Sequence, residues 1–240
     1  MRCLALVFSL LVSLYASSQQ VVDVASQDVR IGYKDFFVSG NEPFVTTKFV
    51  NLVEGSPYFK DEWMKAVVVD KMDRIYKDIQ IRVDLFGNKI HFLGDKEQEF
   101  VATIPLKQVV LTDGSGNNYR FDHSNAFEKV NNAERDRWYL WLASGPASLY
   151  KKIEKDLSEF RPYASSVVEQ RIKTNERYIV LYMDSFHEVK KLKDVPSVLM
   201  DKKKELEDFL KTKDDDKASM DDRMVSVIQY YNSLQAKKGS

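Results

Sequence analysis

The sequence predicts an α+β fold that is mainly β: an antiparallel meander, in the form of a curved sheet, a sandwich or a partly closed barrel, followed by two C-terminal amphipathic helices. Three observations lead to this prediction. Residues 29–192 consist of short stretches rich in β-branched and aromatic residues, separated by Gly, Asn, Asp and Pro. Several stretches alternate apolar and polar residues, as strands do. Beyond residues 194–197, apolar residues recur at helical spacing instead.

The first twenty residues have the composition of a secretory signal peptide. Arg2 precedes an apolar run at residues 4–12, and small residues follow at Ala16 and Ser18. Because the run is shorter than the roughly 20 apolar residues that cross a bilayer, we predict cleavage after residue 18 and not an uncleaved anchor helix. The expected location is the periplasm, the outer membrane or the extracellular space.

The mature chain is predicted to contain a β-rich domain, residues 19–193, and a helical hairpin, residues 194–240, packed on it. The single cysteine, Cys3, lies in the signal peptide, so the core must hold the fold without disulfides. Loss of Arg2 leaves 35 basic and 36 acidic residues, a balance that provides no general attraction to nucleic acid. No second apolar run reaches spanning length, so we expect no transmembrane segment in the mature chain.

The clearest strand pattern lies at residues 74–93. The odd positions from 79 to 85 are apolar and the even ones polar, so we expect the even set, which includes Arg82 and Asp84, to face water. Gly87 and Asn88 then predict a hairpin turn in which the glycine adopts a positive φ.

The other strands are predicted where β-branched and aromatic residues cluster. Residues 138–143 are apolar on both faces, so this strand is expected to be buried on both sides, with Trp138 and Trp141 inside. Residues 166–173 and 177–183 predict a hairpin that turns at 174–176. The remaining predicted strands are residues 49–53, 66–69, 100–104, 108–112, 119–121 and 186–190.

The aspartates at 214–216 and 221–222 separate the two predicted helices. Counted from Asp214, an EF-hand loop requires Gly at the sixth position and Glu at the twelfth, which here are Ser219 and Val225, so no calcium site is predicted. Ser219 with Asp222 instead matches a capping box, which predicts that the last helix starts at this point.

Three motifs carry a resemblance to a group of proteins. They are GSPYFKDEW at residues 55–63, YKDIQIRVDLFGNKIHFL at residues 76–93, and the YYN segment at residues 230–232. Together they resemble the secreted, β-rich, functionally uncharacterised proteins of Bacteroidetes. The resemblance spans most of the mature chain and implies an exported protein with this strand order. It implies no catalytic or binding residue.

The sequence predicts no catalytic residue, no cofactor and no metal ligand. Asp122, His123 and Ser124 are the residue types of a hydrolase triad, but neighbours in an extended chain point to opposite sides and cannot bond to one another in series. There is no H-E-x-x-H motif, and the mature chain has no cysteine to hold zinc.

The candidate residues for binding a ligand or partner are Tyr58, Phe59 and Trp63, in a charged turn. Aromatic rings in such a turn are typical of a platform for a sugar, peptide or lipid. The alternative is that they close the end of the curved sheet.

Three functions remain open. The first, which requires least, is an exported, non-enzymatic envelope protein that binds a protein or polymer. The others are a carrier of an apolar ligand under a helical lid and a hydrolase of envelope polymers. The sequence indicates neither the identity of the partner nor the oligomeric state.

Overall fold

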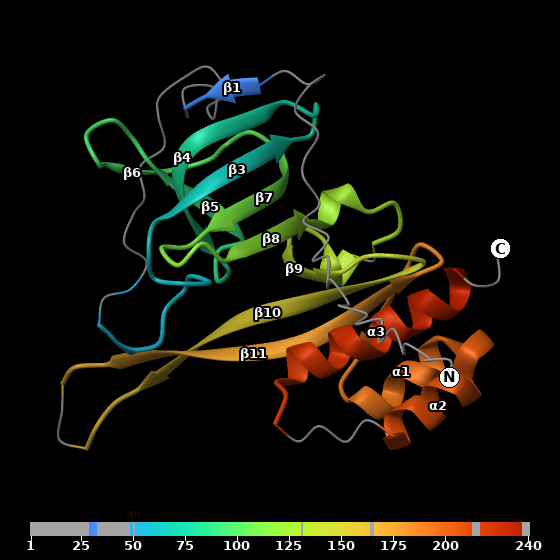
Figure 1. Ribbon diagram of the computed structural model, residues 1–240. Helices are drawn as coiled ribbons and strands as arrows, with labels where there is room; N and C mark the ends of the chain where they lie inside the picture. Colours follow the sequence, from blue (N-terminus) through green and yellow to red (C-terminus); the bar gives the residue numbers. More distant parts are fainter. Residues whose placement is uncertain are drawn as a thin grey trace, which may run out of the picture.

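The computed structural model describes residues 29–32, 49, 51–130, 132–163, 166–212 and 217–236. The predicted signal peptide, residues 1–18, and the aspartates at 214–216 lie outside these ranges. The described residues contain twelve strands in one large mixed sheet that is not closed, which confirms the predicted fold class (Figure 1). The strands are β1 (Val29–Ile31), β2 (Leu52–Glu54), β3 (Met64–Asp70), β4 (Ile75–Asp84), β5 (Lys89–Leu93), β6 (Glu99–Val101), β7 (Leu106–Thr112), β8 (Asn118–His123), β9 (Trp138–Ala143), β10 (Ala147–Phe160), β11 (Glu169–Tyr182) and β12 (Ser185–Val189).

The sheet consists of two antiparallel meanders that meet at β3. Strands β3 to β6 follow one another across the sheet, and so do β7 to β12, while β7 pairs antiparallel with β3. The two short strands depart from this order, because β1 pairs parallel with β4 and β2 pairs parallel with β11. The predicted meander is therefore present, with one crossover between β6 and β7.

The connection between β6 and β7, residues 102–105, forces the sheet to roll. At one end of the connection, Ala102 donates its N–H to the carbonyl of Ile90, and Ile90 pairs with a residue near the end of β4. At the other end, Leu106 pairs with Asp70, which lies beside the start of β4. In a flat sheet these two sites lie about 30 Å apart, four strand spacings across and the length of β4 along. Four peptide steps reach only about 14 Å. The strands must coil until β6 and β7 come close.

The rolled strands enclose the larger core. Its buried members come from β3 through β10, and the biggest fully buried rings are Tyr76, Phe92, Phe100 and Phe121. Trp138 and Leu140 of β9 face this core, while Tyr139 on the opposite face is buried in a smaller cluster with Tyr150 and Ile179. The prediction that residues 138–143 are buried on both faces is thus confirmed for the first half of the strand.

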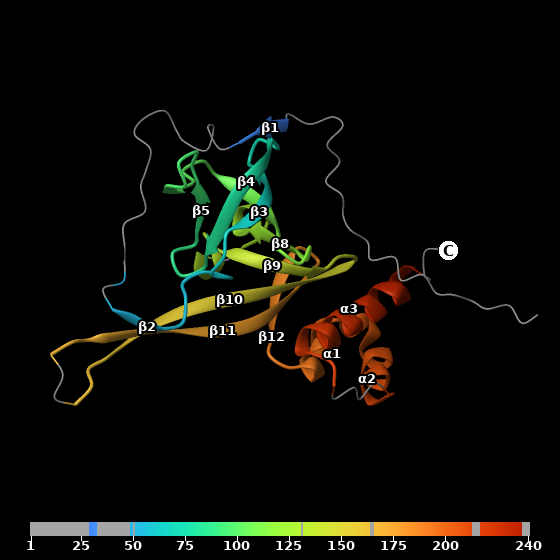
Figure 2. The ribbon, with the colours of Figure 1, turned by 60° about the vertical axis from the view of Figure 1, so that its left-hand side comes forward.

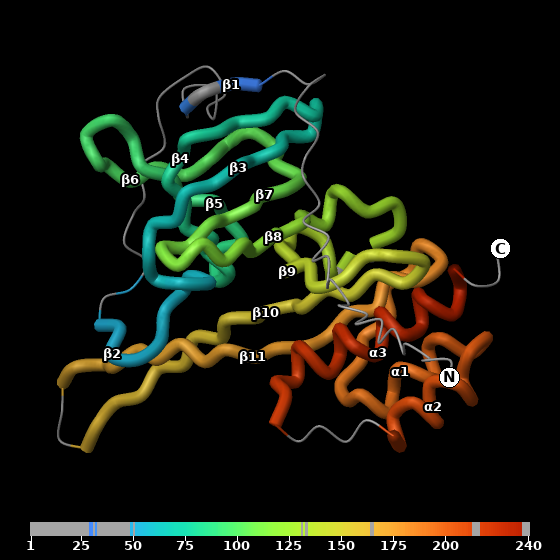
Figure 3. The backbone as a smooth tube through the Cα atoms, in the orientation of Figure 1, coloured from blue at the N-terminus to red at the C-terminus, as the bar shows by residue number. Residues whose placement is uncertain are grey.

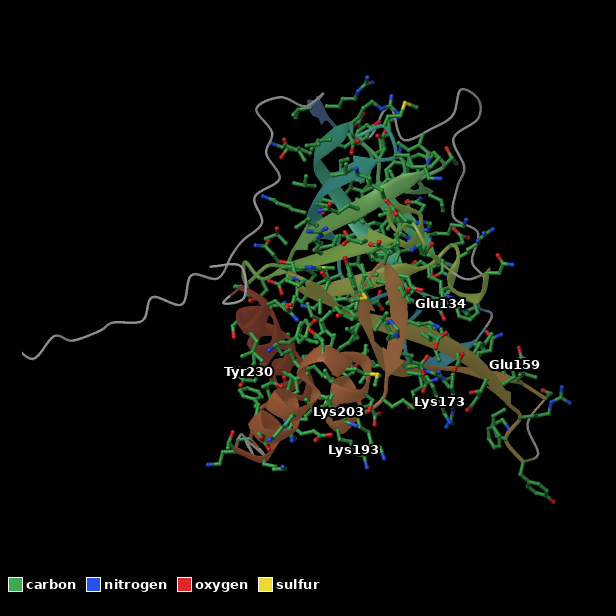
Figure 4. All side chains as sticks on the ribbon, turned by 90° about the vertical axis from the view of Figure 1, so that its right-hand side faces the viewer. Glu134, Glu159, Lys173, Lys193, Lys203 and Tyr230 are labelled. Atoms are coloured by element: carbon green, nitrogen blue, oxygen red, sulfur yellow. The ribbon has the colours of Figure 1, made fainter. Side chains whose placement is uncertain are left out.

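Strands β10 and β11 form a long ribbon whose outer half projects from the body as an arm (Figure 2). Their inner halves are buried, whereas residues 156–160 and 173–177 are exposed. Among the described strands, β2 alone pairs with the outer half, along β11. In Figure 4, the arm extends past Lys173 towards Glu159.

The predicted hairpin turn at residues 174–176 is wrong, because β11 runs straight through it. Thr174 and Asn175 pair across the ribbon, where Lys155 Nζ donates to Thr174 Oγ1 (3.0 Å) and Asn175 Nδ2 donates to Asp156 Oδ2 (2.5 Å). The true turn lies beyond Phe160. Polar residues occur in mid-strand at positions 173–177 because these positions are exposed. The inner half of β10 is instead buried at successive positions, so residues 147–153 lack the alternation that would have predicted a strand there.

The hairpin of β4 and β5 is confirmed, but its positive φ belongs to a different residue. Asn88 has φ 52°, whereas Gly87 is not among the positive-φ glycines. Asparagine tolerates the left-handed region because its short polar side chain bonds locally. Asp84 Oδ1 accepts the N–H of Gly87 (2.8 Å) and so holds the start of the loop.

The helices cover the inner ends of β9 to β12 and form a second core with them. They are the short α1 (Val195–Val198), α2 (Lys203–Thr212) and α3 (Met220–Ala236). Val227, Ile228 and Tyr231 of α3 are buried against Leu149 and Val180 of the ribbon. Figure 4 places Tyr230 and Lys203 in this region. Among the described residues, none of the helices is long and apolar enough to span a bilayer.

The predicted cap of the last helix is confirmed. Ser219 Oγ accepts the N–H of Asp222 (3.1 Å) at the start of α3, and the Asp222 carboxylate accepts the Ser219 hydroxyl (2.7 Å). Asp221 has a further role, because its carboxylate accepts hydrogen bonds from Lys151 Nζ (2.6 Å) and Tyr178 Oη (2.5 Å). The acidic first turn therefore also fastens α3 to the ribbon.

The YYN segment attaches α3 to the sheet. Asn232 bonds the β9–β10 turn with three hydrogen bonds: its Oδ1 accepts from Ala147 N (2.9 Å), and its Nδ2 donates to the carbonyls of Ser144 (3.1 Å) and Ala147 (2.9 Å). Figure 3 follows the chain through this turn, beside the C-terminal part of α3. Gly145 is required there, because an added Cβ would lie 2.3 Å from Asn232 Nδ2.

Replacing Asn232 is expected to loosen α3 from the sheet. Asn232→Ala removes three hydrogen bonds to backbone groups, and we expect the free energy of unfolding to fall by about 2 kcal/mol in urea denaturation. The matched control is Gln229→Ala, an exposed position on the same helix, which should change stability by less than about 0.5 kcal/mol. Equal effects of the two substitutions would contradict this role of Asn232.

Candidate functional site

Two of the three predicted binding residues, Tyr58 and Trp63, stack on Arg82. The guanidinium carbon of Arg82 lies 3.9 Å from the centroid of the Tyr58 ring and 4.2 Å from that of Trp63. The turn holds this position because Tyr58 bridges to Asp84 of β4 and Phe59 N donates to Val83 O (2.9 Å). Arginine between two aromatic faces is a favourable cation–π arrangement.

Arg82 is also the centre of a polar network on the outer face of β4, β5 and β6. Its Nη2 donates to Glu99 (2.8 Å) and its Nη1 to Asp61 (3.1 Å). His91 completes the network, with Nδ1 at 2.7 Å from Glu99 Oε1 and Nε2 at 3.6 Å from Asp84 Oδ2. The predicted exposure of the even-numbered positions is therefore wrong for Arg82 and Asp84, which are covered by the aromatic turn and by β5.

Burial and hydrogen bonding have opposite effects on the pKa of Glu99. Burial favours the neutral acid, but the hydrogen bonds from His91 and Arg82 outweigh it, so the pKa of Glu99 lies below its usual value. The pKa of the Tyr58 phenol is raised by burial and by the adjacent Glu99 charge. Glu99 is thus a carboxylate and Tyr58 a phenol at neutral pH. The two Nη atoms of Arg82 have carboxylate partners in the network, whereas its buried Nε has no hydrogen-bond partner among the described residues.

Phe59, the third predicted residue, points the other way. Its ring packs edge-on against Tyr119 (5.1 Å between centroids) and Phe121 (4.9 Å) at the margin of the larger core. The aromatic turn therefore closes the sheet with Phe59 and clamps Arg82 with Tyr58 and Trp63. This geometry matches the alternative interpretation of the turn, in which the rings stabilise the end of the sheet.

A cleft of about 510 Å³ opens at one end of the rolled sheet, away from the aromatic turn. It lies between the β6–β7 connection and the segment after β8, which contains the 3₁₀ turns η1 (Ser124–Ala126) and η2 (Asn132–Glu134). The helices α1 to α3 pack on the second core and not over this opening. Sequence analysis did not predict the cleft, because residues 71, 104, 123 and 135 show no common pattern along the chain.

His123 lies in the wall of the cleft. Its Nδ1 accepts the N–H of Asn125 (3.3 Å), its Nε2 is 3.3 Å from Asp136 Oδ1, and its ring packs edge-on against Trp138 (4.8 Å). Burial lowers the pKa of His123, an effect that Asp136 only partly opposes. Both ring nitrogens therefore contact protein groups.

The neighbours of His123 in the chain bind elsewhere. The carboxylate of Asp122 accepts from Arg120 (2.9 Å) and from the buried hydroxyl of Tyr150 (3.1 Å). Ser124 is buried and its Oγ accepts the N–H of Arg137 (3.3 Å). The three adjacent residues have separate partners and do not form a relay.

Within the described part of the chain, no group of three or more His, Cys, Asp or Glu side chains is arranged to hold a metal ion. No protein-family model, no curated protein and no solved structure matches this chain.

Glu99 should make the stability of the protein depend on acid. Because its pKa is depressed in the folded state, its contribution is complete above the usual value of 4.5 and is lost as the pH falls through the lower folded value. Glu99→Gln should therefore reduce the free energy of unfolding by about 1 to 2 kcal/mol at pH 7 and by less below pH 4. Urea denaturation between pH 3 and pH 7 measures this difference.

Glu207→Gln, at an exposed position of α2, is the control, and its effect should stay within about 0.5 kcal/mol. A Glu99→Gln deficit that is the same at pH 3 and pH 7 would show that the carboxylate charge does not carry the contribution.

Proposed function

We propose that this chain is an exported, non-enzymatic binding protein of the cell envelope, and that the tip of the β10–β11 arm engages a protein partner. One observation carries the proposal: exposed apolar side chains gather on the arm. Of the ten exposed large hydrophobic side chains in the described residues, five lie on the arm or on β2 beside it. These are Val53, Leu157, Phe160, Tyr163 and Val167.

The arm does not bury these groups within its own fold. Phe160 is half exposed and Tyr163 fully exposed, although both are aromatic and both occur where the ribbon reaches furthest from the body. A two- or three-stranded ribbon has no second layer to cover its faces. Exposed apolar groups that are contiguous, and not scattered, mark interaction surfaces in soluble proteins.

The residue types at the tip favour a protein partner. Phe160, Arg161 and Tyr163 are types that are enriched in the centres of protein interfaces. Arg161 is exposed and forms no ion pair with any described residue, and an acidic group of a partner would match its charge. The matching surface is an apolar pocket with a carboxylate at its rim.

Export is supported by the signal-like residues 1–18 and by the resemblance to secreted β-rich proteins of Bacteroidetes. The binding role is supported by the arm. It is also supported by the contacts of His91 and His123, whose ring nitrogens all lie against other groups of the protein. A binding protein with an arm needs neither a catalytic residue nor a cofactor.

In-cell photo-cross-linking tests the arm. We expect a photoreactive phenylalanine analogue at position 163 to give a discrete covalent adduct, and the same analogue at Met183 to give none. Met183 is an equally suitable control because it is exposed at the opposite end of β11. Phe160→Ser, added to the position-163 variant, should abolish the adduct.

Binding of the identified partner should weaken about 30-fold in Phe160→Ser, the cost of losing one aromatic anchor. Urea denaturation of the same variant should be unchanged, because Phe160 is exposed. Identical adducts from positions 163 and 183, or an adduct that survives Phe160→Ser, would refute the arm as the binding surface.

A further inference from the structure

The cleft at the open end of the rolled sheet has an apolar floor. Ile90, Leu106 and Trp138 are buried members of the larger core, and their outward edges form the bottom of the cleft. Ile104 and Phe127 flank them as partly covered side chains. Ile90, Leu106 and Trp138 are only 3%, 5% and 4% exposed. The apolar surface open to a ligand therefore comes mainly from Ile104 and Phe127, and apolar atoms that cover it would gain roughly 25 cal/mol per Å².

Among the described residues, the rim of the cleft carries more positive than negative charge. Lys71, Lys89 and Arg135 line it, are exposed, and form no ion pair with the described residues. The lining also contains two carboxylates, Glu128 and Asp136, of which Asp136 faces His123, so the cations outnumber the acids by three to two. These cations come from three separate segments, namely the β3–β4 turn, the start of β5 and the segment before β9, and the roll brings them to one opening.

We propose that this cleft binds a small organic anion, with its apolar body against Ile104 and Phe127 and its carboxylate or phosphate at Lys71, Lys89 and Arg135. This site is distinct from the arm and does not depend on it. The cleft volume of about 510 Å³ lies in the range of pockets that hold one small molecule.

Both halves of the ligand follow from the lining. A neutral apolar molecule would leave the excess of cations at the rim without a partner, and a bare inorganic anion would leave the apolar side chains Ile104 and Phe127 exposed to water. An organic cation would meet three like charges at the rim, which is unfavourable. His123 does not add a charge, because burial and the nearby Lys71 lower its pKa. The anion is therefore held by the rim alone.

Calorimetric titration of the purified protein at low salt tests the ligand class with four probes. Decanoate and 2-naphthoate represent a fatty-chain acid and an aromatic acid, decanol has the chain without the charge, and sodium phosphate has the charge without the body. We expect saturable 1:1 binding of decanoate, of 2-naphthoate or of both. The probe that binds shows whether the apolar body of the ligand is a fatty chain or an aromatic ring. Added salt should weaken this binding because it screens the rim cations.

The double variant Lys71→Gln/Lys89→Gln should weaken binding of the organic acid about tenfold, since each exposed ion pair contributes about threefold. The matched control is Lys65→Gln/Lys190→Gln, two exposed lysines that lie outside the cleft, and it should bind like the parent protein. All four positions are exposed, so the variants should fold alike, which urea denaturation verifies.

Three results would overturn the proposal. One is binding of neither organic acid. Another is binding of decanol as tight as that of the acids, which would show that the charge of the ligand is not needed, or equally tight binding of phosphate, which would show that its apolar body is not needed. The last is equal weakening by the two double variants, which would place the anion elsewhere on the surface.

Discussion

The four-residue connection between β6 and β7 is the constraint on which the rest of the structure depends. It joins two points that a flat sheet would hold about 30 Å apart, so strands β3 to β9 must coil around one another. Coiling buries one face of these strands completely, and the large rings Tyr76, Phe92, Phe100 and Phe121 fill the interior. No disulfide is needed, because the rolled sheet buries its apolar face within itself.

The same roll determines what lies outside it. Since the roll uses β3 to β9, the inner halves of β10 and β11 need another cover, and α3 supplies it through Val227, Ile228 and Tyr231. Asn232 and Asp221 fix the two ends of this helix to the sheet. In the described part of the chain, β2 is the one strand that pairs with the outer half of the ribbon, which remains an arm with exposed apolar side chains.

Both proposed binding surfaces therefore arise where the rolled sheet ends. The cleft is the end of the roll that side chains leave open, and the arm is the part of the ribbon that extends past the roll. They present different chemistry: the cleft combines an apolar floor with an excess of cations, whereas the arm presents aromatic rings around one arginine. The two proposed sites lie on different parts of the chain, so the proposed anion and the proposed protein partner would not compete for one surface.

The sequence alone determined the fold class, most strands of the body, both main helices and the cap at Ser219. In these segments the sequence pattern follows from local structure. A strand with one buried face must alternate apolar and polar residues, and the first turn of a helix needs an acceptor for its free N–H groups. The sequence also drew attention to Tyr58 and Trp63, whose place in a charged turn is visible without the structure.

Only the tertiary structure decided what lies against these local elements. It turned Arg82 and Asp84 from expected surface residues into a buried network, because β5 and the aromatic turn cover them. It made one strand of residues 169–182, because β11 pairs with β10 along its whole length, including the exposed polar residues 173–177. It also brought Lys71, Lys89 and Arg135 to one opening. Such placements depend on how distant segments meet across the roll, which no local period in the chain encodes.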